Sequence, residues 1–117
     1  MFNEVFSHNS VKFDYDGKDN MYMSIEDYVL NNKISPETVN KVMGVWINPK
    51  SKHGARGVVV LEGININVPA HMNKDIETIR ENADLVSGIN AGKCGIRFYT
   101  YEKDGKTYYS GRFCDYE

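Results

Sequence analysis

Apolar and polar residues alternate with a period of two in several short stretches of the chain, as they do in half-buried β-strands. Residues 64–68, with the sequence ININV, alternate strictly, and this alternation places Asn65 and Asn67 on the outer face of a strand. Further strands are predicted at residues 11–16, 42–47 and 58–61, before a final pair within residues 94–117. The chain is therefore expected to be rich in short strands.

Three other stretches have the spacing of amphipathic helices. In residues 24–32, Ser24 stands where a helix N-cap is expected, and Asp27 follows it three residues later. Two further helices are predicted at residues 70–82 and 84–90. Ser35-Pro36 indicates either one more helical turn or a loop, because proline suits the first position of a helix.

The order of these elements favours an α+β fold with a mostly antiparallel sheet, since strands stand on both sides of the helices and are joined by tight turns. A small, partly open barrel of the OB type fits this order, because that fold combines about five strands with an intervening helix. A flat sheet with helices on one face fits as well. No internal repeat or Pro/Gly/Ser-rich linker interrupts residues 1–117, so a single domain is expected.

The composition is that of an ordinary globular protein, with 117 residues of which 41% are hydrophobic and 26% charged. No apolar run approaches the length of a membrane span, and the first ten residues lack the pattern of a signal peptide. Two cysteines without a secretion signal indicate reduced thiols, so we expect a cytoplasmic protein that does not contact a membrane. The formal net charge of −2 provides no general attraction to nucleic acid, so any contact with DNA or RNA needs a local basic patch.

Charge is unevenly distributed along the chain. The first 28 residues are acidic and carry Glu4, Asp14, Asp16, Asp19, Glu26 and Asp27 against Lys12 and Lys18. Between residues 41 and 61 every charged residue is basic, and these residues are Lys41, Lys50, Lys52 and Arg56. An acidic N-terminal portion thus precedes a basic middle, although an ordinary solvated surface explains either stretch taken alone.

No motif in the chain matches a catalytic or metal-binding signature. The segment from Gly88 to Cys94 resembles a phosphate-binding loop, but it has three residues between its glycines instead of four and no Ser or Thr after Lys93. A helix end with Gly92 as C-cap is the better interpretation. The histidines and cysteines are too scattered for a zinc pattern, and His71 is expected to be a surface residue. We therefore expect a protein without metal or cofactor that is not an enzyme.

The last segment contains Asp104-Gly105, a strong hairpin signal, because a type I′ turn needs positive φ at both central residues. With these two residues as the loop, directly opposed residues share a face of the hairpin. One face then carries Arg97, Tyr99, Tyr101, Tyr108, Ser110 and Arg112, and the other carries Ile96, Phe98, Thr100, Tyr109, Gly111 and Phe113. The second set is an ordinary core face. In this register Cys94 and Cys114 lie on opposite faces, so no disulfide is expected between them.

The polar face of the hairpin suits single-stranded nucleic acid, because bases stack on tyrosine rings and arginine contacts phosphate without needing a particular base. The loop with Lys50, Lys52, His53 and Arg56 would hold the backbone beside it. The same face suits a protein partner, since Tyr and Arg are enriched at interface hot spots. A third interpretation is a ladder of tyrosines packed under a helix. A free hairpin edge also suits a homodimer formed by sheet extension.

From about Val45 onward the order of features resembles that of small, mostly uncharacterised proteins from phages and mobile elements of Gram-positive bacteria. The segments that carry the resemblance are PKSKHGARGVVV, GININVPAHM with its helix, and INAGKCGIRFYTYEKDGKTYY. The resemblance implies a cytoplasmic, non-enzymatic accessory protein of the bacterial host cell and assigns no role to any residue.

An inhibitor of a host defence protein, of the anti-CRISPR kind, is the alternative to nucleic-acid binding. Such a protein would present an acidic surface that imitates phosphate charge. The candidates for that surface are Asp14, Asp16, Asp19, Glu26 and Asp27.

Overall fold

The computed structural model describes residues 13–15, 17–49 and 54–117, and these residues form an α+β fold, which confirms the expected class. The strands are β1 (Met21–Ser24), β2 (Asn40–Lys41), β3 (Gly44–Asn48), β4 (Arg56–Leu61), β5 (Ile64–Asn67), β6 (Cys94–Lys103) and β7 (Lys106–Asp115). The helices are α2 (Ile25–Asn32), α3 (Asn73–Glu81) and α4 (Ala83–Asn90), and a short 3-10 helix, η1 (Ala70–Met72), leads into α3. Within the described part of the chain, no helix has the length and apolar character needed to cross a membrane.

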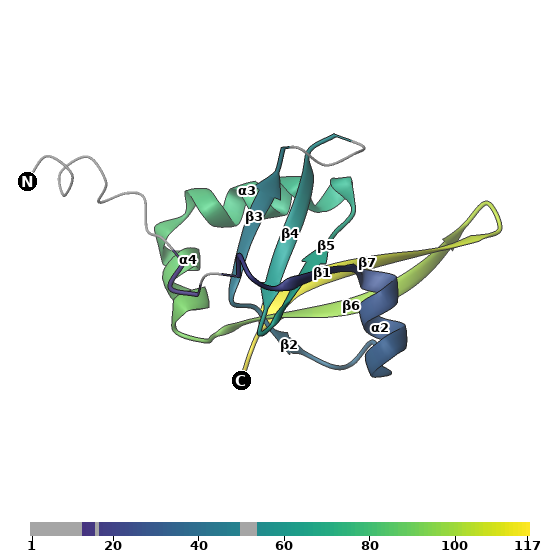
Figure 1. Cartoon of the computed structure of the whole chain (residues 1–117), viewed down its shortest axis with the longest axis horizontal. Coiled ribbons are helices and arrows are strands. Elements are labelled where there is room, and N and C mark those ends of the chain that lie inside the picture. The colour runs from purple at the N-terminus through teal and green to yellow at the C-terminus, as the bar shows by residue number, and fades with distance from the viewer. Residues whose placement is uncertain (1–12, 16, 50–53) are drawn as a thin grey trace, which may run out of the picture.

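The strands form two open sheets (Figure 1). The first has the order β1-β5-β4-β3 and is antiparallel except for the parallel pair of β1 and β5. The second has the order β2-β6-β7 and is antiparallel throughout. Neither sheet closes on itself, so the OB-type barrel is not confirmed.

One stretch of chain, residues 40–48, passes from the second sheet to the first. The amide of Val42 donates to the Cys94 carbonyl at 2.9 Å, whereas the next amide, of Met43, donates to the Val60 carbonyl at 2.7 Å. Successive amides thus bond to different sheets. The strand predicted at residues 42–47 is therefore confirmed over residues 44–47, which belong to β3, whereas Val42 and Met43 lie at the crossing between β2 and β3.

The hydrophobic core lies between the first sheet, the helices α3 and α4, and the base of β6. On the inner face of the sheet, Val45, Val59 and Ile66 lie side by side and are almost completely buried. Ile76 of α3 and Ile96 of β6 belong to the same cluster and are fully buried. Figure 1 shows the two helices on one side of the sheet, an arrangement that removes the apolar faces of all three elements from water.

The sequence made two local predictions around α2, an N-cap at Ser24 before it and either a helical turn or a loop at Ser35-Pro36 after it. The Ser24 hydroxyl accepts a hydrogen bond from the Asp27 amide at 3.1 Å, so the predicted N-cap is confirmed and α2 begins at the next residue. The segment at Ser35 forms a turn closed by the Thr38 amide, which donates to the Ser35 carbonyl at 3.1 Å. The alternative of a further helical turn is therefore wrong, and the loop alternative is confirmed.

The end of α4 matches its expected role as a helix terminus. Gly92 has a φ of 75°, in the left-handed region that favours glycine. The amide of Lys93 reaches back to the Gly88 carbonyl at 2.9 Å, which is the bond that closes a glycine-ended helix. The segment from Gly88 to Cys94 is thus a helix end, as expected.

The prediction that Asn65 and Asn67 lie on the outer face of the strand is confirmed, but the sequence pattern did not predict that Asn65 is buried there. Asn65 and Asn67 share the outer face of β5, and Asn67 is exposed as expected, but only 1% of Asn65 is exposed. The chain before β1 lies over it: the Asn65 amide donates to the Gly17 carbonyl at 2.9 Å, and its oxygen accepts from Asn20 Nδ2 at 3.1 Å. Strand alternation defines the two faces of β5, but this distant segment decides that one position of the outer face is buried.

The strand predicted at residues 11–16 is also wrong where the structure describes it. Residues 13–15 are not part of a strand, and residues 11, 12 and 16 lie outside the described residues. The amide of Asp14 donates to Asn90 Oδ1 at 2.8 Å, so this segment is attached to α4 by a side chain instead of a sheet ladder. The first strand of the described chain is β1, which the alternation did not predict.

Candidate nucleic-acid interface

The register of the C-terminal hairpin is the one expected from Asp104-Gly105. The paired residues are Lys103 with Lys106, Tyr101 with Tyr108, Tyr99 with Ser110, and Arg97 with Arg112. Asp104 has a φ of 54° and Gly105 a φ of 78°, so both central residues adopt the positive values that a type I′ turn requires. The predicted division of the hairpin into two faces is therefore confirmed.

The outer half of the hairpin projects beyond the body of the protein (Figure 1). We call residues 99–108 the arm, and every residue in it is exposed. The base of the hairpin is buried instead, with Ile96 0% and Phe98 2% exposed. The projection contributes to the elongated shape of the molecule, whose extents are 56 × 33 × 25 Å.

Three tyrosines form a continuous row on one face of the arm. The rings of Tyr101 and Tyr108 are stacked, with centroids 5.4 Å apart and planes inclined by 20°. The ring of Tyr99 lies 6.4 Å from that of Tyr101, and the guanidinium of Arg112 lies over Tyr99 at 5.9 Å from its centroid. These tyrosines are 36–40% exposed. A tyrosine ladder is thus formed, but it faces solvent and is not packed under a helix.

The face that carries the tyrosines is also uniformly basic. Between residues 97 and 112, alternation along the paired strands puts eight residues on it, which we call the tyrosine face: Arg97, Tyr99, Tyr101, Lys103, Lys106, Tyr108, Ser110 and Arg112. Four of these are cations and none is an acid, whereas Glu102 lies on the opposite face. The candidate residues chosen from the sequence omitted Lys103 and Lys106, although the same pairing argument places them beside the tyrosines.

Ser110 is the one member of the tyrosine face that is fully buried. His71 of η1 covers it, with Nε2 2.8 Å from the Ser110 hydroxyl. His71 is itself exposed, as expected, and the contact joins η1 to the base of the hairpin. Because the serine has no access to solvent, we assign the pair a structural role in holding the arm against the body.

The opposite face of the hairpin anchors the arm to α2. The ring of Phe98 packs edge-to-face against Tyr28, with centroids 5.7 Å apart. Tyr109 and Phe113 are half-buried against the core, as expected for that face, whereas Thr100 is exposed because it already lies in the projecting part. The arm is thus held at its base by aromatic packing and leaves its tyrosines free to meet a partner.

Most of the basic loop predicted to act beside the hairpin falls outside the described residues, namely Lys50, Lys52 and His53. Arg56, its remaining member, is half-buried at the start of β4, in the other sheet. Its Nε is buried and has no hydrogen-bond acceptor among the described residues. The amide of the next residue, Gly57, donates to Asn73 Oδ1 at 2.8 Å, so Arg56 stands close to the beginning of α3.

The acidic residues of the alternative function lie on the surface where they are described. Asp14, Asp19, Glu26 and Asp27 are exposed, and Asp16 is outside the described residues. Glu26 and Asp27 occupy the first turn of α2, where a negative charge stabilises the helix. Their position thus has a structural explanation that needs no partner.

The two cysteines are free thiols, as expected from their opposite faces. Burial raises the pKa of the Cys94 thiol from 9.0 to about 11, with smaller contributions from neighbouring Cys114 and Asp115. Within the described chain, no three His, Cys, Asp or Glu side chains converge in a way that would hold a metal ion.

Comparison of the chain with protein-family models, with curated proteins and with solved structures gave no match. The function is therefore argued from the geometry of the tyrosine face.

Proposed function

We propose that this protein binds single-stranded nucleic acid through the tyrosine face of its hairpin arm, as a cytoplasmic, non-enzymatic accessory protein of the phage or mobile-element type that its strand order resembles. The observation that carries the proposal is the combination of three exposed, mutually stacked tyrosines with four cations and no acid on one projecting face. Proteins that bind single strands without sequence preference use this combination of aromatic platforms and positive charge.

The dimensions of the face suit a short stretch of strand. Lys103 lies six positions after Arg97 along β6, which corresponds to about 20 Å at the rise of a β-strand. At about 3.4 Å for each stacked nucleotide, and more for extended ones, this length accommodates about three to six nucleotides. The cations stand at both ends of the tyrosine row, so phosphates can be contacted before and after the stacked bases.

The local charge also explains how a protein with a net charge of −2 would attract a polyanion. The tyrosine face carries four cations, of which Lys103 and Lys106 lie on the arm, whereas Glu102 lies on the opposite face and Asp104 lies in the turn at the tip. Screening limits the influence of distant acidic residues to about 8 Å at physiological ionic strength. A strand that approaches the tyrosine face therefore meets a positive surface despite the acidic total.

The test measures fluorescence anisotropy of a labelled dodecamer of thymidines at low salt. We expect Tyr101→Thr combined with Tyr108→Thr to weaken binding at least about tenfold, because stacking contributes about 1–3 kcal/mol per base. Threonine keeps the β-propensity of both positions, so the arm remains a hairpin. If the four cations of the face contact phosphates, the logarithm of the affinity falls with the logarithm of the salt concentration with a slope of about −3.

The matched control lies on the same arm. Thr100→Ala combined with Thr107→Ala alters the exposed opposite face and is expected to leave the affinity unchanged within about twofold. Lys74→Gln, an exposed cation on α3, is the control for non-specific charge. Absence of binding by the wild-type protein, or equal losses in the tyrosine and threonine variants, contradicts the proposal and leaves the tyrosine face as a protein interface of the kind an inhibitor would use.

The arm also leads to a proposal about oligomeric state. β7 is the outer strand of its sheet, and β6 pairs with β2 only through Gly95 and Ile96. Both sides of the arm therefore have backbone groups outside a ladder, which suits a homodimer formed by strand pairing. Light scattering at micromolar concentration tests this, and a monomeric mass rules it out under those conditions.

A further inference from the structure

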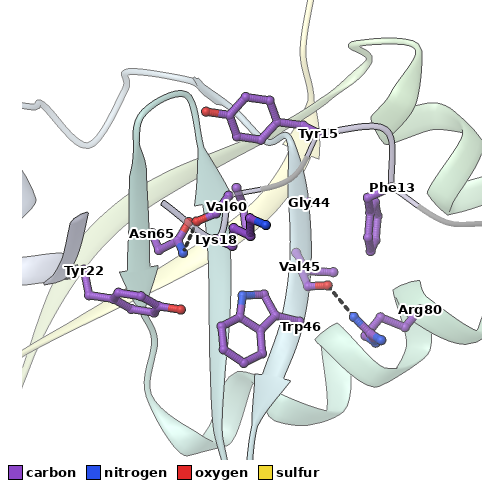
Figure 2. Close-up of a pocket in the computed structure, with 11 residues that line it drawn as sticks. Phe13, Tyr15, Lys18, Tyr22, Gly44, Val45, Trp46, Val60, Asn65 and Arg80 are labelled. Atoms are coloured by element: carbon purple, nitrogen blue, oxygen red, sulfur yellow. Dashed lines mark hydrogen bonds between the residues drawn. The ribbon is translucent and has the colours of Figure 1, made fainter. Parts of the chain in front are cut away.

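A pocket lies on the outer face of the first sheet, away from the arm. Figure 2 shows this cavity of about 340 Å³, which is bounded by β1, β3, β4 and β5, by the segment before β1, and by one residue of α3. Its size is within the range of small-molecule pockets, which is about 300–1,000 Å³. Val60 of β4 and Gly44 of β3 contribute to its lining.

Four aromatic rings form the walls of this pocket. Tyr22 and Trp46 meet edge-to-face, with centroids 6.4 Å apart and planes inclined by 79°. Phe13 and Tyr15 line it from the segment before β1. The Tyr15 hydroxyl is held in place by the Gly63 amide, which donates to it at 3.1 Å. Rings fixed in this way provide flat surfaces on which a planar aromatic ligand can stack.

The charge in the lining has a single sign. Among the described residues that line the pocket, Lys18 and Arg80 are cations and none is an acid. Arg80 extends from α3 to the edge strand β3, where its Nη1 donates to the Val45 carbonyl at 2.8 Å (Figure 2). This bond uses one of the five N–H groups of the guanidinium and fixes its position. The described lining thus combines two cations with aromatic rings and contains no acid.

Polar donors complete the lining. Within the described chain, neither the indole N–H of Trp46 nor the hydroxyl of Tyr22 takes part in a hydrogen bond, although both side chains line the cavity (Figure 2). Donors directed into an aromatic pocket are what fixes the orientation of a heterocyclic ligand.

We propose that this pocket binds a nucleotide, with the base among the four rings and the phosphate beside Lys18 and Arg80. The shared chemistry is that of a nucleoside monophosphate, either free in solution or as one unit of a strand. The site uses none of the residues of the tyrosine face, so it is independent of the function proposed for the arm.

Trp46 is the only tryptophan in the chain, so its fluorescence reports directly on the pocket. We expect adenosine monophosphate to quench this fluorescence saturably, with a dissociation constant of about 1 mM or below. Adenosine lacks the phosphate, and ribose 5-phosphate lacks the base. Each is therefore expected to bind at least about tenfold more weakly than adenosine monophosphate. If a trinucleotide binds more tightly than the mononucleotide, the ligand of the pocket is one unit of a strand. If the two bind equally, the ligand is the free nucleotide.

Two variants test the two halves of the site. Arg80→Gln removes the charge but keeps a donor for the Val45 carbonyl, and Tyr22→Leu removes one half-exposed ring from the wall. Each is expected to weaken binding about tenfold. Arg112→Gln on the arm is the charge control and is expected to leave nucleotide binding unchanged.

No quenching by adenosine monophosphate up to about 10 mM overturns the proposal, as does quenching that neither pocket variant alters. The double variant Tyr101→Thr with Tyr108→Thr separates the two proposals. It is expected to lose oligonucleotide binding through the arm while its pocket still binds the mononucleotide, so failure of one site does not imply failure of the other.

Discussion

Asn65 offers a direct test of how the segment before β1 is attached to the sheet. The substitution Asn65→Ala removes a side chain that is 1% exposed and makes two hydrogen bonds, to the Gly17 carbonyl at 2.9 Å and from Asn20 Nδ2 at 3.1 Å. Gly17 is buried, so its carbonyl loses its donor in a place with little access to water. Asn20 keeps a second acceptor, the Leu61 carbonyl at 3.2 Å.

These contacts determine how far the substitution Asn65→Ala lowers the free energy of unfolding. Two hydrogen bonds contribute about 1 kcal/mol each, and the unsatisfied carbonyl and the small cavity add to the loss. We expect Asn65→Ala to lower the free energy of unfolding by about 2–3 kcal/mol. Asn67→Ala is the matched control, because Asn67 lies on the same face of the same strand but is exposed, and its substitution should cost less than about 0.5 kcal/mol.

Urea unfolding followed by Trp46 fluorescence measures both variants. With an m-value of about 1.5 kcal/mol/M, the expected loss in Asn65→Ala lowers the midpoint by about 1–2 M at unchanged m. Equal losses in Asn65→Ala and Asn67→Ala, or a loss below about 0.5 kcal/mol in Asn65→Ala, would refute the reasoning. Either result would mean that residues 17–20 do not cover the outer face of β5.

Two further predictions concern buried polar groups near the hairpin. Because burial raises the pKa of Cys94 from 9.0 to about 11, the unfolded thiol ionises before the folded one as the pH rises through this window. The free energy of unfolding should therefore fall more steeply between these pH values in the wild type than in Cys94→Ala, and parallel curves would contradict this. His71→Ala leaves the fully buried Ser110 hydroxyl without its partner and should lower the free energy of unfolding by about 1 kcal/mol. Ser110→Ala should cost less, because it leaves only the exposed His71 without a partner, and water can solvate that ring. Thermal unfolding compares the two variants, and a larger loss in Ser110→Ala would contradict this order.

Much of the candidate interface was predictable because turn chemistry is local. Asp104-Gly105 determines the register of β6 and β7, and the register determines which side chains share a face. From this alone, Arg97, Tyr99 and Arg112 were assigned to one side of the hairpin. That the arm projects, and that the tyrosines are exposed on it, depends on where α2 and η1 end against the hairpin, and the sequence pattern does not contain this information.

The pocket on the outer face of the first sheet was not predictable either, because it also depends on how distant segments pack. Its lining comes from the segment before β1, from four strands and from α3, which are far apart in the sequence. None of these segments carries a ligand motif by itself. Trp46 and Arg80 come together only because α3 packs beside the edge strand β3 and the arginine bonds to the backbone of that strand.

By itself, the sequence determined the elements whose signals act over a few residues: the cap of α2 at Ser24, the glycine end of α4, the hairpin turn and the α+β class. Only the tertiary structure decided how residues 40–48 divide between two sheets, which face of β5 is covered, and where concave surfaces form. The physical reason is that turns and caps are governed by local backbone geometry and hydrogen bonds, whereas burial depends on which distant segment displaces water from a face. Asn65 and Asn67 illustrate this, since the same residue type on one face of one strand is buried in one case and solvated in the other.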